Sequence, residues 1–319
     1  MNYIYFIKFN TILPFNVNSS SMTLSFPNIN PIIFSFDFFG LELSLRYYSL
    51  SYIFGIIIAW KIILEISKRE ILWPKNFNRL NPKDVEDLIF HLAVGIVLGG
   101  RLGYVLFYQP AMIFYDPIFI FQVWKGGMSF HGGFLGVVAA GILFGYKRKI
   151  PILILGDVIA TASPPGIFLG RLANFINGEL WGKPTSAFTG IIFPNREAQE
   201  CPIDWLTICT RHPTQLYEAL FEGLVLGLLL LFFLFKMRGL FYPGRTISLF
   251  LIFYGASRFC IEYFRQADAQ FISDSNPHGQ IITFYYRMAE FGGLTMGQIL
   301  CIPMIIFGIF LFKYSKNLR

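Results

Sequence analysis

Seven apolar stretches, each long enough or nearly long enough to cross a bilayer as a helix, constrain the fold of this chain more than any other feature. They lie near residues 47–65, 88–108, 131–146, 152–175, 214–235, 246–264 and 296–312. A helix needs roughly 20 apolar residues to cross about 30 Å of hydrocarbon. With 55% hydrophobic and 14% charged residues, the chain cannot cover that much apolar surface with polar groups in water. We therefore predict an all-α integral membrane protein with seven transmembrane helices, forming a single membrane domain over residues 22–319.

The basic residues are distributed unevenly among the segments that connect these stretches. Segments 66–87, 147–151, 236–245 and 313–319 hold 14 lysines and arginines in 44 residues, whereas segments 109–129, 176–213 and 265–295 hold 6 in 90. Because cytoplasmic loops carry the excess of basic residues, the first group is predicted to be cytoplasmic. The N-terminus is then outside, the C-terminus is cytoplasmic, and residues 176–213 form a small periplasmic loop region. The net charge of +7 reflects this topology rather than nucleic-acid binding.

The N-terminus and the cysteines add two expectations. Residues 1–21 do not resemble a signal peptide, because Lys8 and Asn10 interrupt the apolar stretch, and we treat them as an extension with Met22 as an alternative start of translation. Cys201 and Cys209 lie in the same outer loop, and the sequence leaves open whether they form a disulfide. The cysteines show no CxxC pair and no metal-binding spacing with histidine, so no metal site is predicted.

Several polar side chains fall at one level, near the outer ends of the predicted helices. They are Tyr48, Arg101, His131, Arg171, Asn174, Tyr254, Arg258 and Glu262. A charged side chain inside a span costs about 2.5–3.5 kcal/mol on insertion scales. Each has a structural explanation when taken alone: Arg101 can extend to the surface, and Arg258 can pair with Glu262 four residues later. Together, arginines from separate spans suit an anionic lipid head group, because the planar guanidinium donates two parallel hydrogen bonds to phosphate.

Proline and glycine residues mark irregular or closely packed helices. Residues 164–166 place Pro-Pro-Gly in the middle of the fourth stretch, and such a break within a membrane is tolerated only where the backbone faces protein or a wet cavity. Small residues recur at helix-packing spacing at Gly95, Gly99 and Gly103, and at Gly132 and Gly136. These patterns predict a tightly packed bundle with an internal polar site.

His131 is the best candidate for proton transfer. The imidazole group titrates near neutral pH and can accept a proton from a substrate. Glycines at positions 126, 127, 132 and 133 flank it and permit close approach of the backbone. The alternative, in which His131 only begins a helix, stays equally open at this point.

Six sequence blocks occur in an order that resembles the prolipoprotein diacylglyceryl transferase family of bacterial inner-membrane enzymes. They are GGRLGYVLFY (99–108), VWKGGMSFHGG (123–133), GRLANFINGELWGK (170–183), RHPTQLYE (211–218), FRQADAQF (264–271) and MGQIL (296–300). The resemblance implies seven helices with an external N-terminus, in agreement with the topology inferred from charge. It also implies a multi-pass protein of the bacterial cytoplasmic (inner) membrane.

The resemblance further implies a reaction and a set of site residues. The expected reaction moves the diacylglyceryl group of phosphatidylglycerol to the lipobox cysteine of a prolipoprotein, forming a thioether and releasing glycerol 1-phosphate. This is the first step of bacterial lipoprotein maturation, and it needs no cofactor. We expect catalytic roles for His131, Arg171 and Arg258. The resemblance implies substrate contacts from Tyr48, Asn174, Glu179, Gly182, Tyr254 and Glu262, and the membrane level of Arg101 adds it to this set.

Two other classes of protein remain as alternatives at this stage. A transporter or channel for an anionic solute would suit the broken helix and the intramembrane arginines, although no internal repeat is visible. A non-catalytic lipid-binding scaffold would suit the same residues. Only an enzyme would convert a lipobox peptide into a lipid-modified one.

Overall fold

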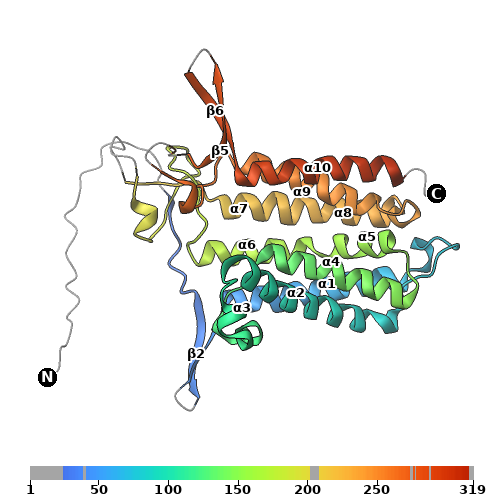
Figure 1. Cartoon of the computed structure of the whole chain (residues 1–319). Coiled ribbons are helices and arrows are strands. Elements are labelled where there is room, and N and C mark those ends of the chain that lie inside the picture. The colour runs from blue at the N-terminus through green and yellow to red at the C-terminus, as the bar shows by residue number, and fades with distance from the viewer. Residues whose placement is uncertain are drawn as a thin grey trace.

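In the computed structural model, the described part of the chain is a bundle of roughly parallel and antiparallel helices with short strands at one end (Figure 1). The description covers residues 24–38, 41–201, 208–273, 276, 278–286 and 289–315. The predicted extension 1–21 and the alternative start Met22 lie outside these residues. The longer helices are α1 (Tyr47–Lys68), α2 (Val85–Tyr108), α4 (Phe130–Arg148), α5 (Ile152–Ala162), α6 (Pro164–Ile176), α8 (Leu226–Lys236), α9 (Arg245–Ile261) and α10 (Met296–Tyr314).

Shorter helical turns connect or extend these helices. They are η1 (Glu70–Leu72), η2 (Pro82–Asp84), α3 (Met112–Tyr115), η3 (Pro117–Phe121), η4 (Val123–Lys125), η5 (Glu197–Gln199), α7 (Thr214–Glu218), the π-helix η6 (Ala219–Val225), η7 (Gly239–Phe241) and η8 (Ala269–Phe271). Because α7, η6 and α8 follow one another without a gap, residues 214–236 form one long helix with a π-helical section in its middle.

Among the described residues, six helices are long and apolar enough to cross a membrane. They cover Tyr47–Lys68, Pro82–Tyr108, Phe130–Arg148, Ile152–Ile176, Thr214–Lys236 and Met296–Tyr314. Their ends lie within a few residues of the predicted stretches, which confirms a mostly helical, multi-pass membrane protein. The remaining predicted stretch, 246–264, corresponds to α9, which has 17 residues and packs against α10.

The break predicted at residues 164–166 is confined to one residue. Helix α5 ends at Ala162, Ser163 keeps helical backbone angles, and α6 begins directly at Pro164. Proline is well accommodated in the first turn of a helix, where its missing N–H has no partner to lose. The two helices therefore continue as one span of 25 residues rather than opening a long irregular segment.

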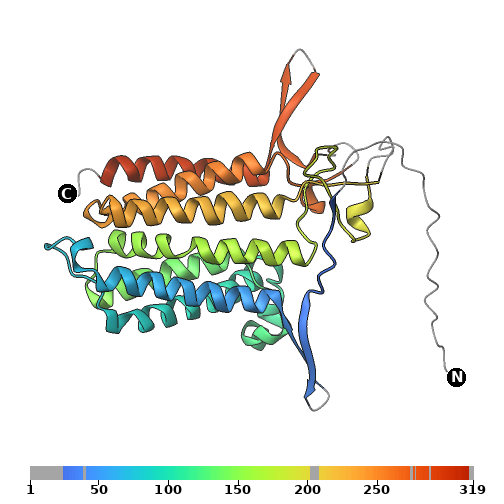
Figure 2. The same cartoon turned by 180° about the vertical axis from the view of Figure 1, so that it is seen from behind.

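The fold is mostly helical, which is consistent with the predicted all-α membrane protein, and the described residues also form three two-stranded sheets. Strands β2 (Ile32–Phe38) and β3 (Leu41–Arg46) are antiparallel, as are β5 (Gln280–Tyr286) and β6 (Ala289–Thr295), while β1 (Leu24–Ser25) pairs in parallel with β4 (Ile191–Ile192). All these strands lie outside the apolar stretches from which the helices were predicted. The hairpins β2–β3 and β5–β6 project sideways from the same end of the bundle in both views (Figures 1 and 2). We call this end the hairpin end.

Glycines bring α2 and α4 into backbone contact, as the spacing predicts. A Cβ atom added at Gly99 would overlap the backbone of Gly132 and Gly136, and one added at Gly95 would overlap that of Gly136. Small residues allow such an approach between membrane helices, where dispersion contacts replace the hydrophobic effect as the source of stability. The close α2–α4 pair fixes the position of the loop that precedes α4.

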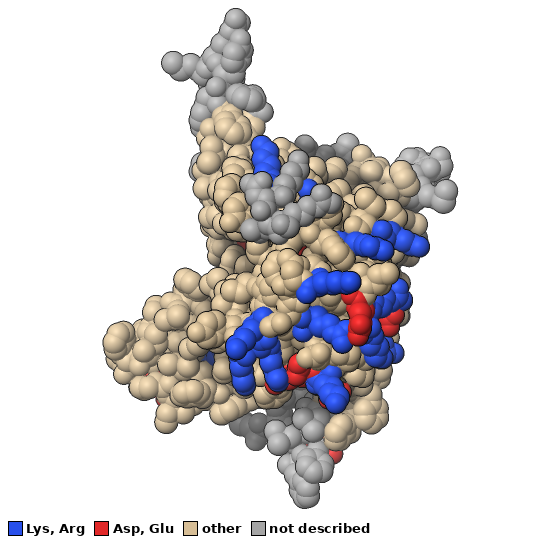
Figure 3. Space-filling model, turned by 90° about the vertical axis from the view of Figure 1, so that its right-hand side faces the viewer, with Lys and Arg blue, Asp and Glu red and all other residues tan. Residues whose placement is uncertain are grey.

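The end of the bundle opposite the hairpins holds the main buried apolar cluster and most basic side chains. Ile63, Ile66, Leu88 and Phe144 are almost fully buried in this cluster. Figure 3 faces this end and shows lysines and arginines gathered over it, with few acidic side chains among them. We call it the basic end.

Candidate active site

Two arginines from different helices meet on one carboxylate near the hairpin end. Arg171 lies on α6, Arg258 on α9, and Glu218 at the end of α7. The Nε atom of Arg171 lies 3.1 Å from Oε2 of Glu218, and Nη1 of Arg258 pairs with Oε1 of the same carboxylate. The sequence predicted that Arg171 and Arg258 would share one site, and the structure brings them together.

A second buried carboxylate lies one helical turn beyond the first. Glu222 belongs to the π-helix η6, and its Oε2 atom lies 3.6 Å from Nη2 of Arg171. The side chains of Glu218 and Glu222 are 1% and 0% exposed, whereas that of Arg171 is 22% exposed. π-Helical turns are rare and frequently occur at functional sites. Both arginines therefore pair with buried carboxylates while part of each guanidinium side chain stays exposed.

The third carboxylate of the cluster, Glu262, also pairs with Arg258. Nη2 of Arg258 lies 2.9 Å from Oε2 of Glu262, which confirms the predicted pair, and Nη1 of Arg265 lies 3.8 Å from the same oxygen. The hydroxyl of Thr295 donates to Oε1 of Glu262 at 3.2 Å. Thr295 also begins α10 in a capping box with Gln298, so the start of α10 fixes the position of Glu262.

Three further predicted residues form a hydrogen-bonded group beside the arginines. The hydroxyl of Tyr48, at the start of α1, donates to the carboxylate of Glu179 and accepts from the amide of Asn174. Nδ2 of Asn174 also donates to Glu179 at 2.8 Å. Tyr48 and Tyr254 both lie within electrostatic range of Arg171. Tyr48, Asn174 and Glu179 thus hold one another, and Tyr48 brings this group within electrostatic range of Arg171.

Gly182, another predicted site residue, serves to pack the loops beyond the arginines. Its N–H donates to the carbonyl of His212 at 2.8 Å, and its carbonyl accepts from Arg211 at 3.2 Å. A Cβ atom at this position would collide with His212 and with the carbonyl of Phe264. The disulfide between Cys201 and Cys209, which the sequence left open, closes the same loop region, with the two Cα atoms 5.8 Å apart.

Two basic side chains of this loop region have altered proton affinities. Burial lowers the pKa of Lys183, whose ammonium group donates to the carbonyl of Tyr263 at 2.9 Å. Burial also lowers the pKa of His212, and the positive charge of Lys183 lowers it further. The Nδ1 atom of His212 lies 3.2 Å from the hydroxyl of Tyr217.

None of the described contacts of Arg101 is with this cluster. Its side chain is buried, with the residue 2% exposed, so it does not extend to the surface. It donates to the carbonyls of Ile120 and Gly127 at 3.2 and 3.3 Å, and it stacks on the ring of Phe119 at 4.4 Å. Arg101 therefore anchors the loop before α4, and no described contact supports its predicted role in lipid binding.

His131 lies at the start of α4, just after that loop. Ser129 caps this helix by accepting from the N–H of Gly132 at 3.3 Å. The imidazole is exposed and packs edge-to-face on Phe130, with ring centroids 5.8 Å apart. No hydrogen bond or ion pair joins it to another side chain in the described part of the chain. Its role as a base stays a prediction.

The sequence comparison decides the family. Residues 32–314 match the family model described as prolipoprotein diacylglyceryl transferase. The chain belongs to this family. A phosphatidylglycerol–prolipoprotein diacylglyceryl transferase of Ruegeria pomeroyi is 49% identical over 286 residues, covering 90% of this chain and 95% of the relative. Proteins of the same name from Roseobacter denitrificans and Rickettsia felis are 46% and 44% identical, each over 92% of this chain and 98% and 99% of their own.

In this member of the prolipoprotein diacylglyceryl transferase family, the arginine cluster contains two carboxylates that the sequence analysis missed, Glu218 and Glu222. A signal was available: two carboxylates four residues apart within an otherwise apolar span must be paired or neutral. Glu218 was visible only as the last letter of the block RHPTQLYE. Its partners lie 47 and 40 residues away along the chain, so no local pattern could identify them.

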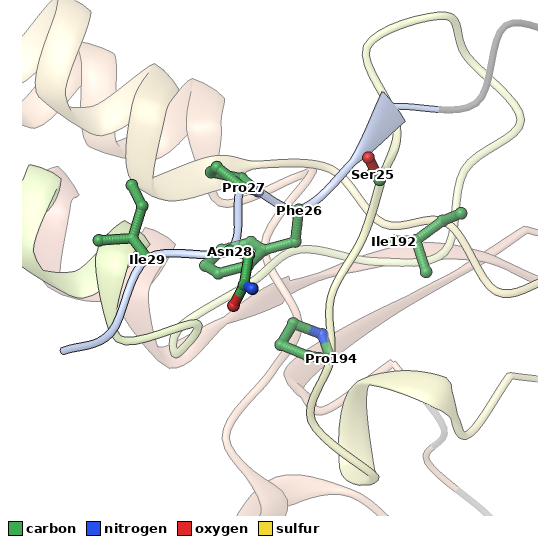
Figure 4. Close-up of a pocket in the computed structure, with 7 residues that line it drawn as sticks. All are labelled: Ser25, Phe26, Pro27, Asn28, Ile29, Ile192 and Pro194. Carbon is green, nitrogen blue, oxygen red and sulfur yellow. The ribbon is translucent and has the colours of Figure 1, made fainter.

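A separate pocket of about 360 Å³ lies among the loops of this family member, between the N-terminal segment and β4 (Figure 4). Its lining residues are Ser25, Phe26, Pro27, Asn28, Ile29, Ile192 and Pro194. None of these side chains carries a charge. The arginine cluster, and not this pocket, has the charge that an anionic head group requires.

Proposed function

We propose that this chain transfers the diacylglyceryl group of phosphatidylglycerol to the lipobox cysteine of prolipoproteins. The observation that supports this most strongly is the meeting of Arg171 and Arg258 on Glu218. Two guanidinium groups held at one place offer several parallel N–H donors to a phosphate. Their side chains are 22% and 14% exposed, so part of each remains open to a ligand.

The neighbouring polar residues would orient the lipid head group. Tyr48, Asn174 and Glu179 hold one another by hydrogen bonds, so their side chains are fixed before a ligand arrives. Fixed donors and acceptors lower the entropy lost on binding and keep reacting atoms aligned. In this proposal they contact the glycerol part of the head group, while Glu262 keeps Arg258 in place.

The reaction follows from the chemistry of the two substrates. A free thiol with a pKa of about 8.5 must lose its proton to become an effective nucleophile. His131 is the proposed base, either directly or through water. The thiolate sulfur then forms a bond to the terminal glyceryl carbon of the diacylglyceryl group, while the bond from that carbon to the phosphate oxygen breaks. Negative charge grows on the departing glycerol phosphate, where Arg171 and Arg258 would stabilise it. This substitution requires no cofactor or metal.

We further propose seven spans, with α9 as the seventh, in a bacterial inner membrane. The basic end (Figure 3) would face the cytoplasm, because cytoplasmic segments carry the excess of lysine and arginine. The N-terminus and the hairpin end would then face the periplasm, where translocated prolipoproteins present their lipobox cysteine. Residues 22–319 would act as one membrane domain that binds membrane lipid and signal peptides but not nucleic acid.

Purified protein incubated with labelled phosphatidylglycerol and a lipobox peptide tests the proposal. We expect a peptide that carries a thioether-linked diacylglyceryl group, detected by mass spectrometry. Arg171→Gln and Arg258→Gln should each slow transfer by about 100–1000-fold, because each removes a donor to the developing charge. Arg196→Gln, in an exposed position of the outer loops, is the control and should transfer at the normal rate. An unmodified peptide with the unaltered protein would exclude the enzyme.

His131 needs its own test, because the structure leaves its role open. His131→Gln should slow transfer strongly near neutral pH and less at high pH, where more of the substrate thiol is ionised without a base. The measurement is the pH–rate profile of the variant against the unaltered protein. A profile of unchanged shape would remove His131 as the base.

A further inference from the structure

The arginine cluster carries no excess positive charge before any lipid binds. Three guanidinium groups, those of Arg171, Arg258 and Arg265, are paired with three buried carboxylates, and Arg265 also pairs with the exposed Asp268 at 3.4 Å. The buried carboxylates are Glu218, Glu222 and Glu262. A phosphodiester would add one further negative charge to this group. In a largely buried site such an excess charge is costly unless a proton enters with it.

The three carboxylates differ in how firmly they are held. Glu218 contacts both Arg171 and Arg258 directly. Glu262 lies 2.9 Å from Arg258 and accepts a hydrogen bond from Thr295. Glu222 is held less firmly than the other two. Both of its carboxylate oxygens are buried without a hydrogen bond, and its ion pair with Arg171 spans 3.6 Å. Neutralising Glu222 would therefore disturb the fewest interactions.

The surroundings of Glu222 make its charge depend on the arginines. The helices packed against η6 are α6, α7, α8 and α9. Helix α6 contributes Arg171, α7 contributes Glu218, and α9 contributes Tyr254 and Arg258. Arg265, which follows α9, also acts on Glu222. The titratable side chain of α8 is Lys236, at the far end of that helix. Among the described residues, the guanidinium groups of Arg171, Arg258 and Arg265 favour an ionised Glu222, and a bound phosphate would weaken their effect.

We propose that Glu222 takes up one proton when the lipid phosphate binds beside Arg171 and Arg258. This inference rests on the proposed function, because it assumes that phosphatidylglycerol binds at these arginines. Neutral Glu222 no longer competes for Arg171, so the guanidinium becomes available to the phosphate. Glu222 is thus a positioning residue that acts through Arg171, and the proton comes from the solvent.

Isothermal titration calorimetry with a short-chain phosphatidylglycerol tests the proton uptake directly. Binding is measured in detergent over a pH series, in buffers with different ionisation enthalpies, which gives the number of protons taken up per lipid. We expect a maximum close to one proton. By linkage, the Kd should rise by up to about tenfold per pH unit in the range of uptake.

Matched variants assign the proton to one residue. Glu222→Gln should bind the lipid without proton uptake and with a Kd that no longer changes over this pH range. Glu197→Gln, an exposed position in the outer loops, and His131→Gln should both retain the uptake. If Glu222→Gln fails to fold, the number of protons that the unaltered protein takes up per lipid still tests the inference.

The outcomes separate this inference from the function on which it rests. Lipid binding without proton uptake at any pH would overturn the inference and leave the proposed function intact. An unchanged uptake in Glu222→Gln would do the same. No binding of phosphatidylglycerol by the unaltered protein would overturn both.

Discussion

Glu218 is the carboxylate that links Arg171 to Arg258 in the described polar cluster. Its two oxygens reach arginines on two different helices, and its side chain is 1% exposed. A buried charge is tolerated when opposite charges surround it, and removing one partner leaves the others uncompensated. Glu218 therefore positions the two guanidinium groups and also compensates their charge in the buried site.

Replacing Glu218 by alanine should lower the free energy of unfolding by about 3–5 kcal/mol, because Arg171 and Arg258 lose a shared counter-charge in a buried site. Thermal or detergent-induced unfolding of the purified protein measures the change. Glu86→Ala, at an exposed position of α2, is the matched control and should stay within about 0.5 kcal/mol. If both variants lost the same free energy of unfolding, Glu218 would contribute no more to stability than the exposed Glu86.

At the scale of elements, close helix pairs bring the site residues together. Helix α9 is held at the basic end by Asp157 of α5, which accepts the N–H groups of Gly244 and Ile247 at 2.8 Å each. This satisfies donors at the start of a helix that have no partner within it. Helices α2 and α4 are held by glycines in backbone contact. Small changes in these contacts would shift side chains at the other end of each helix.

The glycine contact predicts a sharp difference between two neighbouring positions of α4. Gly136→Ala should destabilise the protein by about 1–3 kcal/mol, because its Cβ would overlap the backbone of Gly95. Gly133→Ala should be neutral or stabilising, since its Cβ would lie 3.7 Å from the carbonyl oxygen of Ile96 and alanine favours a helix. Unfolding of the two purified variants provides the comparison. Similar stabilities would mean that α2 and α4 do not pack through Gly136.

At the scale of the whole molecule, charge separates the two ends of the bundle. The basic end carries the lysines and arginines that Figure 3 shows, while the hairpin end carries the disulfide and the arginine cluster. Disulfides persist in oxidising compartments such as the periplasm. Both features support the proposed orientation, in which phosphate chemistry takes place at the periplasmic surface.

Cysteine labelling tests this orientation. In a background with Cys260→Ser and Cys301→Ser, Glu197→Cys should react with a membrane-impermeant maleimide in intact spheroplasts. Lys75→Cys, at an exposed position of the basic end, should react only after the membrane is permeabilised. The opposite pattern would reverse the topology and place the arginine cluster on the cytoplasmic side.

The sequence by itself determined six of the membrane-length helices and predicted several members of the polar cluster. Hydropathy acts locally, so the ends of α1, α2 and α10 follow from runs of apolar residues. Glycine spacing likewise predicted the contact between α2 and α4. Arg171 and Arg258 were expected in one site because the charge of the loops assigned both to the same membrane level.

Only the tertiary structure decided which polar groups are paired. Arg101 lies at the predicted level, yet it binds backbone carbonyls of the loop before α4. Glu218 and Glu222 join the arginines because α6, α7 and α9 pack side by side, a relation between distant segments. The physical reason is that hydropathy depends on neighbours along the chain, whereas the stability of a buried charge depends on partners that folding brings close.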